Sequence, residues 1–558
     1  MQTLKNIAKK DIPRWLFCVL VVGVVLAKLA LGYLQNTYIW VGGAPIDDEL
    51  MFAAAQSISA GQWLGDYTWL TLSKQMFFAV WLALCNALHL PYLIAGQALL
   101  CAASYAAMRA FAPVLPQYKT KFLLFAALCF SPAAAASFTL RVYRDNIFPS
   151  LCVLFFAGMI GAALRYHKKL GGYALWLALA GVGMGLSYIT REDGIWLLPF
   201  ALVASVVTVV FVCKEKALPQ KAWRCAAQLL PYALTLCAVL IISGINYAYY
   251  GVFTTSDFSS GSFAAAYGAM TRITHTTETD ALVPVPADVR AQLYAAVPEL
   301  ALLEEALETD QAGVRGGYYN EAIGDYQAGA FYWVLRKAAS EAGVYADAQT
   351  AADYWQSVAD AINAAIADGI LTASSGVRNS TTPIITVQHV LPTLAETLRG
   401  FAYCITFQDT SVYYQTERSI ASEADAALWA DYLGSSANTA AIAGSDAPYY
   451  APIQLLAYRF FNLFRYFYMV AVPLLFALAC YLQGRAMVQM CRAKQWSPLL
   501  LWLILFGVFG MAFLRCAMIA FMEVAAFNIG TYVMYLATVH PLLIIFAVVG
   551  VCCTDAQQ

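Results

Sequence analysis

The sequence has little charge, and it lacks the residue groupings that mark most soluble enzymes. Charged side chains make up 12% of its 558 residues and hydrophobic ones 61%, whereas soluble domains carry roughly 25% charged residues. This composition excludes a globular enzyme with a single anchor and indicates an all-α polytopic membrane protein. Basic residues are not interleaved with aromatic ones in a stripe, so nucleic acid is not an expected partner.

Cysteine and histidine are present, but not in patterns that form a disulfide framework or a zinc site. Of the 14 cysteines, only Cys404 lies in the long polar segment, and the five histidines are scattered. There is no Walker loop and no Rossmann glycine pattern, so a nucleotide is not expected either. The sequence therefore assigns no certain cofactor, and it leaves open whether a divalent metal takes part.

Ten hydrophobic runs approach the roughly 20 residues that a helix needs to cross hydrocarbon. The first follows a basic N-terminus and is interpreted as an uncleaved helix. The runs are 15–34, 91–112, 122–138, 147–164, 171–189, 195–213, 226–248, 466–483, 498–514 and 527–551.

A further run, Gln75 to Leu90, decides the topology. If it crossed, the basic turns at 165–169 and 214–216 would lie outside. If it does not cross, most lysines and arginines lie in the inner turns, as the positive-inside bias requires. We therefore expect a juxtamembrane helix over 75–90, a cytoplasmic N-terminus and a multi-pass protein in the cell membrane.

This topology divides the chain into three parts. Residues 1–248 form an N-terminal transmembrane module whose first outer loop, 35–90, carries the candidate catalytic residues. Residues 249–452 form an extracytoplasmic domain, which is alanine-rich and expected to be mainly helical. Residues 453–558 form the C-terminal transmembrane helices.

Three consecutive carboxylates, Asp47, Asp48 and Glu49, follow the first hydrophobic run. Adjacent carboxylates repel each other, which raises the pKa of at least one of them. The topology places further charges on the same face, and ionisable groups at a bilayer boundary are costly unless they are paired or functional. These charges are Lys74, Arg141, Arg144, Asp145, Arg191, Glu192, Asp193, Arg515 and Glu523. Each group taken alone is consistent with an ion pair between helix ends, but together with the triple acid they predict one shared polar site.

Residues Asp48-Glu49-Leu50-Met51-Phe52 resemble the Asp-Glu-x-x-Phe motif in the first outer loop of protein O-mannosyltransferases. The stretch 55–63 is similar to the Ala…Gly-x-Trp stretch of aminoarabinose transferases that act on lipid A. Both belong to the GT-C superfamily of glycosyltransferases, which use polyprenyl-phosphate sugars. The segment 138–148 and the turn Thr190 to Gly194 also resemble outer loops of that family, whereas Ser73-Lys74-Gln75 lacks the prolines found at its position there.

This resemblance extends over about residues 10–250 and implies a GT-C-like fold and an inverting sugar transfer. The donor would be a sugar on a polyprenyl phosphate, and the acceptor an extracytoplasmic protein, lipid or wall polymer. Asp48 would be the base, with Asp47 or Glu49 and Asp145 as orienting acids. The candidate phosphate ligands are Lys74, Arg144, Arg191 and Arg515. The alternative functions are a transporter or flippase of lipid-linked substrates and a non-catalytic scaffold. Transporters usually consist of two repeated halves, and the sequence shows no such repeat.

Overall fold

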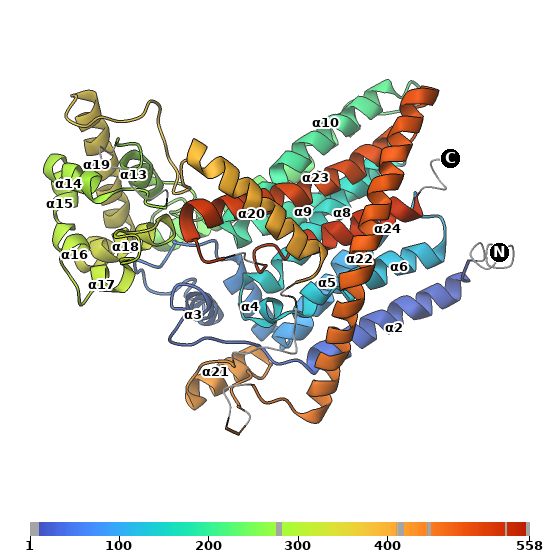
Figure 1. Ribbon diagram of the computed structural model, residues 1–558, viewed down its shortest axis with the longest axis horizontal. Coiled ribbons are helices and arrows are strands. Elements are labelled where there is room, and N and C mark those ends of the chain that lie inside the picture. Colours follow the sequence, from blue (N-terminus) through green and yellow to red (C-terminus); the bar gives the residue numbers. More distant parts are fainter. Residues whose placement is uncertain are drawn as a thin grey trace.

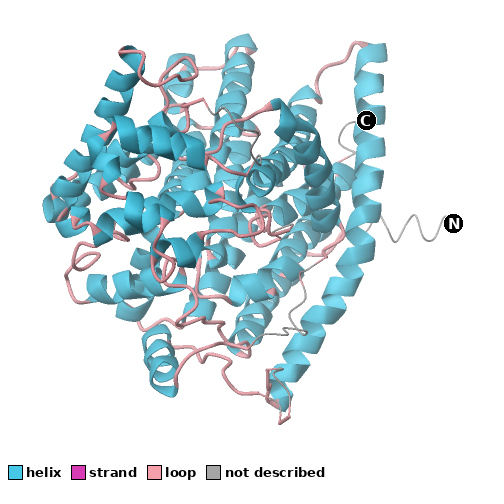
Figure 2. Ribbon diagram, turned by 60° about the vertical axis from the view of Figure 1, so that its left-hand side comes forward, coloured by secondary structure: helices cyan, strands magenta, loops and turns pink. Residues whose placement is uncertain are grey.

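The computed structural model describes residues 11–274, 282–408, 410, 418–441, 443–444, 448–530 and 533–553. Helices joined by loops make up this part of the chain, where β-pairing is limited to isolated bridges (Figure 2). The expectation of an all-α polytopic architecture is thus confirmed. Lys5, Lys9 and Lys10 of the basic N-terminus lie outside the described residues.

Eight spans of the described residues are long and apolar enough to cross a membrane. Proline occupies the first turn of α8, α10 and α12, where the missing N–H removes no helical hydrogen bond. The spans contain α2 (Arg14–Tyr33), α5 (Tyr92–Phe111), α8 (Phe148–Ala163), α9 (Leu170–Thr190), α10 (Leu198–Lys214), α12 (Leu230–Tyr250), α22 (Pro452–Ala493) and α23 (Leu499–Met522).

Two of the ten expected spans are shorter than the sequence predicts. The run 122–138 gives α6 (Tyr118–Cys129), which ends before Pro132 and is followed by the 3₁₀ turn η1 (Pro132–Ala135). The run 527–551 gives α24 (Val539–Cys552), because the chain leaves helical geometry at Asn528, whose φ is +50°. At 12 and 14 residues, these helices are only about 18 and 21 Å long.

The helices run back and forth between two ends of the bundle. We call the end at which α2 ends and α5 and α8 begin the site end. The segment after α2 stays there, with α3 (Asp48–Ser59) packed on α4 (Phe77–Ala87). At 11 residues, or about 16 Å, α4 is too short to cross a bilayer. Helix α2 begins, and α5 ends, at the opposite end of the bundle (Figure 1).

Segment 249–452 contributes to three places in the fold. Helices α13 (Ser262–Met270) to α19 (Ala348–Ala367) share one hydrophobic core, which we call the helical unit. It projects from the site end (Figure 1). Helix α20 (Val387–Ile405) packs instead on α23, and α21 (Glu423–Leu433) places Trp429 against Phe52 of α3 with ring centroids 3.9 Å apart. The remaining helices of the unit are α14 (Ala287–Ala296), α15 (Pro298–Ala301), α16 (Glu304–Glu308), α17 (Val314–Tyr318) and α18 (Ala328–Glu341).

The alternation of the helices allows a labelling test of membrane orientation. Lys168 lies in an exposed turn at the end opposite the site end, and Ser260 is exposed near the helical unit. In a background without exposed native cysteines, a membrane-impermeant thiol reagent added outside intact cells should label Ser260→Cys and spare Lys168→Cys. The positive-inside bias is the physical reason, and the reverse labelling pattern would contradict this orientation.

Candidate active site

Ten ionisable side chains from five separated segments meet at the site end, in what we call the ion-pair cluster. Every member forms at least one ion pair, and the opposite charges are equal in number. The carboxylates are Asp47, Asp48, Asp145, Glu192 and Asp193, and the cations are Lys74, Arg141, Arg144, Arg191 and Arg515. The structure therefore brings together ten of the twelve charges that the sequence places on this face.

Asp47 precedes α3 and is the most exposed carboxylate of the cluster. Its side chain is 34% exposed, and it pairs with Lys74 through Oδ1. The Tyr143 hydroxyl donates a second hydrogen bond to the same oxygen at 2.8 Å. Burial tends to raise the pKa of Asp47, but the Lys74 ammonium and Tyr143 outweigh it and hold the pKa below its usual range. Asp47 is therefore ionised, partly accessible and held by a cation.

Asp48 is the first residue of α3 and has no exposed side-chain surface. Arg141 holds it with Nε 2.9 Å from both carboxylate oxygens and Nη2 2.6 Å from Oδ1. Burial raises the pKa of Asp48 to about 6, although Arg141 opposes the shift. Asp48 and Arg141 thus form a bidentate pair that leaves Asp48 no surface for an incoming molecule.

Two acids predicted for the same face lie outside the cluster. Glu49 turns back and accepts hydrogen bonds from the backbone N–H groups of Gly42 and Ala44, at 2.9 and 3.2 Å. Neighbouring helical residues point about 100° apart, so Glu49 cannot face the same way as Asp48. Glu523 likewise accepts from the Gly530 N–H at 2.5 Å. Both acids fix local loops.

Lys74 is the cation beside the exposed carboxylate. Its side chain is only 8% exposed, and Nζ donates to Asp47 and, at 3.1 Å, to the Tyr143 hydroxyl. The ammonium also lies 5.5 Å from the ring centroid of Trp333, which belongs to α18 of the helical unit. The helical unit thereby covers one side of this ion pair.

Arg144 and Glu192 form the middle of the cluster. Arg144 Nη1 lies 2.8 Å from Glu192 Oε2, and Nη2 donates to the Tyr143 hydroxyl at 2.7 Å. Glu192 also accepts from the backbone N–H of Gln75 at 2.8 Å, next to Lys74 in the chain. The Nε of Arg144 is buried without a hydrogen-bond partner, so this arginine retains one free donor.

Arg191 and Arg515 form the deepest part of the cluster. Arg191 bridges Asp145 at 2.8 Å and Asp193 at 3.0 Å. Arg515 reaches Asp193 at 2.7 Å and donates from Nη2 to the Tyr535 carbonyl at 3.0 Å. Its Nη1 is also buried without a hydrogen-bond partner. This part of the cluster joins the ends of α9 and α23.

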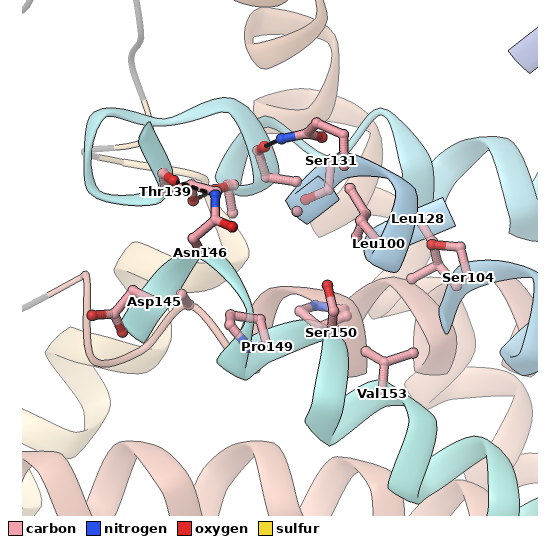
Figure 3. A pocket seen from close by; sticks show the side chains of 16 residues that line it. Leu100, Ser104, Leu128, Ser131, Thr139, Asp145, Asn146, Pro149, Ser150 and Val153 are labelled. Atoms are coloured by element: carbon pink, nitrogen blue, oxygen red, sulfur yellow. Dashed lines mark hydrogen bonds between the residues drawn. The ribbon is translucent and has the colours of Figure 1, made fainter. Parts of the chain in front are cut away.

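A cavity with a mostly apolar lining and several buried polar groups lies next to Asp145, between α5 and the start of α8 (Figure 3). Asn146 and Gln97 donate their amide N–H groups to the carbonyls of Thr139 and Ala134, at 2.9 and 3.3 Å. Their amide oxygens and the Ser131 hydroxyl are buried without hydrogen-bond partners. The Asn146 amide fits only because residue 96 is glycine, since a Cβ there would lie 2.1 Å from Asn146 Oδ1. The cavity is suited to a small molecule that donates hydrogen bonds, such as water.

Among the described residues, no three His, Cys, Asp or Glu side chains are grouped so that they could hold a metal ion. The cluster carboxylates face cations instead. We therefore assign no metal ligands, and the question that the sequence left open stays open.

The sequence named most cluster members but did not give their pairing. It assigned roles to Asp48 and Arg144, but none to Arg141 or Tyr143, which contact Asp48 and Asp47. Both unassigned residues lie within three positions of Arg144, so the charged run around 141–146 was a usable signal. No feature of the sequence predicted Trp333 as a site residue, because only tertiary packing brings it to Lys74.

Arg191 provides a test of how much the deep ion pairs stabilise the fold. Asp145 is 2% exposed, so Arg191→Gln leaves a buried carboxylate unpaired and should destabilise the protein by about 3–5 kcal/mol. Thermal unfolding of the purified protein in detergent measures this loss. The matched control is Arg399→Gln, because Arg399 is 54% exposed and its ion pair is long at 3.6 Å. Equal unfolding temperatures for the two variants would contradict a structural role for Arg191.

Comparison with known proteins gives two loose structural matches. No family model and no curated protein matches the sequence. The crystal structure of ArnT from Cupriavidus metallidurans in the apo state aligns with 95% of this chain and 77% of its own, with 12% identity and a TM-score of 0.30. The structure of ArnT bound to undecaprenyl phosphate aligns with 96% of this chain and 78% of its own, with 12% identity and a TM-score of 0.31. Both alignments span nearly the whole chain and superpose loosely.

Proposed function

We propose that this protein is a membrane glycosyltransferase of the GT-C type, which moves a sugar from a polyprenyl phosphate to an acceptor hydroxyl at the site end. The observation that carries this proposal is the pair of the partly exposed Asp47 and the buried Lys74, surrounded by arginines at the end of a membrane bundle. The pair places a proton acceptor beside a phosphate ligand. The resemblance of residues 48–52 to the Asp-Glu-x-x-Phe motif supports the same function.

The donor phosphate binds by exchange. A sugar-phosphate-lipid diester carries one negative charge, and the ion-pair cluster already has equal numbers of opposite charges. The phosphate therefore takes the place of a carboxylate rather than adding to it. Asp47 and Glu192 have the most exposed side chains, at 34% and 32%, and of the two only Asp47 forms an ion pair with Lys74, so the phosphate replaces Asp47 at Lys74. The free Nε of Arg144 supplies a further donor nearby.

This exchange also activates the base. Lys74 holds the pKa of Asp47 below its usual range, and a carboxylate with a low pKa is a weak proton acceptor. When the phosphate occupies Lys74, Asp47 loses that cation, and its pKa rises. Donor binding thus prepares the carboxylate that the next step uses.

The transfer is a direct displacement at the anomeric carbon. The acceptor oxygen forms a bond to that carbon while Asp47 takes its proton, and the bond from the carbon to the phosphate oxygen breaks. The configuration at the anomeric carbon is inverted. The leaving phosphate gains negative charge, which Lys74 and Arg144 stabilise in a site shielded from water.

Asp48, which the motif indicates as the base, has a positioning role in this proposal. It has no exposed surface and is bound to Arg141 through both oxygens. Arg141 also extends to Asp47 Oδ2 at 3.9 Å, so Asp48 orients the arginine beside the base. Asp145 holds Arg191 through one oxygen, at 2.8 Å.

The site end is proposed to face away from the cytoplasm. The turns at the opposite end carry most of the basic residues outside the cluster, as the positive-inside bias requires of cytoplasmic turns. A polyprenyl-phosphate sugar reaches such a site by lateral diffusion in the bilayer.

Paired asparagine variants separate the two aspartates. Asp47→Asn removes the proton acceptor and should slow transfer by about a hundredfold to ten-thousandfold at matched folded concentration. It also leaves the buried Lys74 ammonium without its ion-pair partner, so the unfolding temperature should fall as well. Asp48→Asn leaves the Arg141 charge without its partner and should lower both the unfolding temperature and the rate. A labelled-donor assay at matched folded concentration in nanodiscs measures the rates. Full activity in Asp47→Asn with loss in Asp48→Asn would return the role of base to Asp48, and full activity in both would exclude this loop from catalysis.

Lys74 provides a test of the exchange step. Lys74→Gln should weaken the binding of undecaprenyl phosphate, because it removes the ammonium that binds the phosphate in place of Asp47. Lys74→Arg keeps a positive charge and should retain part of the affinity. Binding is measured by tryptophan fluorescence on titration of the lipid. The control is Lys337→Gln, which removes a lysine of α18 outside the cluster. Unchanged lipid affinity in Lys74→Gln would contradict a phosphate site at this residue.

A further inference from the structure

Helix α20 is amphipathic, but its apolar face points outward. The side chains that it buries are small or polar, namely His389, Thr397, Gly400 and Cys404. Five large apolar side chains are exposed, and the helical repeat places them on one face. They are Val387 (89% exposed), Leu391 (74%), Leu398 (56%), Val390 (55%) and Leu394 (50%). A helix on the surface of a soluble domain has the opposite arrangement.

This helix lies alongside a membrane span. The His389 ring packs on Phe521, next to the last residue of α23, with centroids 5.8 Å apart. Further along, the Phe401 ring lies 6.0 Å from Phe509, near the middle of α23, and 5.8 Å from Phe476 of α22. The helix therefore runs beside α23, from the site end of α23 towards its middle (Figure 1).

The next long described stretch after α20, which begins at residue 418, lies at the site end. Ile420 donates its N–H to the Ile39 carbonyl at 3.0 Å, and the Ser419 N–H donates to Asn438 at 2.7 Å. Ile39 follows α2 at the site end, so the chain enters and leaves the bundle at the same end. Helix α20 thus approaches the middle of the bundle without crossing it.

Lipid-facing side chains of the neighbouring helices continue the same surface. On α22, Leu474 and Val470 are 67% and 62% exposed, in the two turns before Phe476, which contacts α20. On α23, Phe506 is 55% exposed, three residues from the Phe509 contact. Large apolar side chains are thus exposed on α20 and on both transmembrane helices that it contacts.

We propose that α20 is a membrane-embedded, non-crossing helix whose face of Val387, Val390, Leu391, Leu394 and Leu398 is covered by lipid acyl chains. Glu396 and Arg399 do not prevent this, because they lie on the flank of the helix, where Arg399 reaches Glu396 at 3.6 Å. The small and polar residues face protein, as is typical of helix contacts inside membranes. The segment 249–452 is thus in part a membrane segment.

Site-directed spin labelling tests this placement on the full chain. Nitroxides are attached to Leu391→Cys and Leu398→Cys, in a background whose exposed native cysteines are replaced, and the protein is placed in nanodiscs of phosphatidylcholine and phosphatidylglycerol. Power saturation then compares collisions with oxygen, which concentrates in lipid, and with a nickel chelate, which stays in water. Both labels should favour oxygen over nickel, and the label at 398 should do so more strongly because it lies deeper.

The matched control is Ser260→Cys on the exposed surface near the helical unit, where nickel should dominate. Nickel accessibility at Leu391→Cys equal to that at Ser260→Cys would overturn the proposal, because water would then cover the helix. Low accessibility to both reagents would also overturn it, since a second protein chain would then occupy the face. These outcomes do not depend on sugar transfer.

Discussion

The structure depends on the pairing of opposite charges at the end of an apolar bundle. An unpaired charge is costly away from water, so each cation of the cluster fixes the segment that carries its carboxylate. Arg141 connects the loop before α8 to the start of α3, and Arg191 and Arg515 connect the turn after α9 to α23. Segments that are hundreds of residues apart in the chain therefore meet at fixed positions, and Asp47 and Glu192 retain the most exposed surface, at 34% and 32%.

Hydrophobic periodicity and the distribution of charge in the sequence were sufficient to predict the helical bundle and to identify most residues of the ion-pair cluster. They were insufficient where local breaks or tertiary contacts decide the outcome. Pro132 shortened an expected span, and the burial of Asp48 against Arg141 made Asp47 the more accessible acid. Helix α20 was missed because its composition is mixed, and only the direction of its apolar face reveals its surroundings.

Two parts of segment 249–452 reach the ion-pair cluster from different sides. Arg336 of α18 donates to the Trp69 carbonyl at 2.8 Å and reaches Asp257 at 2.9 Å, which fixes the loop that leads to Lys74. Cys404 of α20 lies 4.0 Å from the Leu536 carbonyl, next to Tyr535, whose carbonyl holds Arg515. The helical unit thus supports the exposed side of the site, and α20 supports its deep side.

The equal numbers of opposite charges in the cluster determine which anions the protein encounters. A site with excess positive charge attracts every dissolved anion over roughly a Debye length, about 8 Å at physiological salt. A balanced site has no such long-range field and offers its cations only to an anion that is already in contact. Inorganic phosphate and soluble nucleotides are then not concentrated at the entrance. In the proposed exchange, a lipid-borne phosphate competes with Asp47 for Lys74. Because the lipid is confined to the bilayer at the depth of Lys74, the local concentration of its headgroup decides this competition.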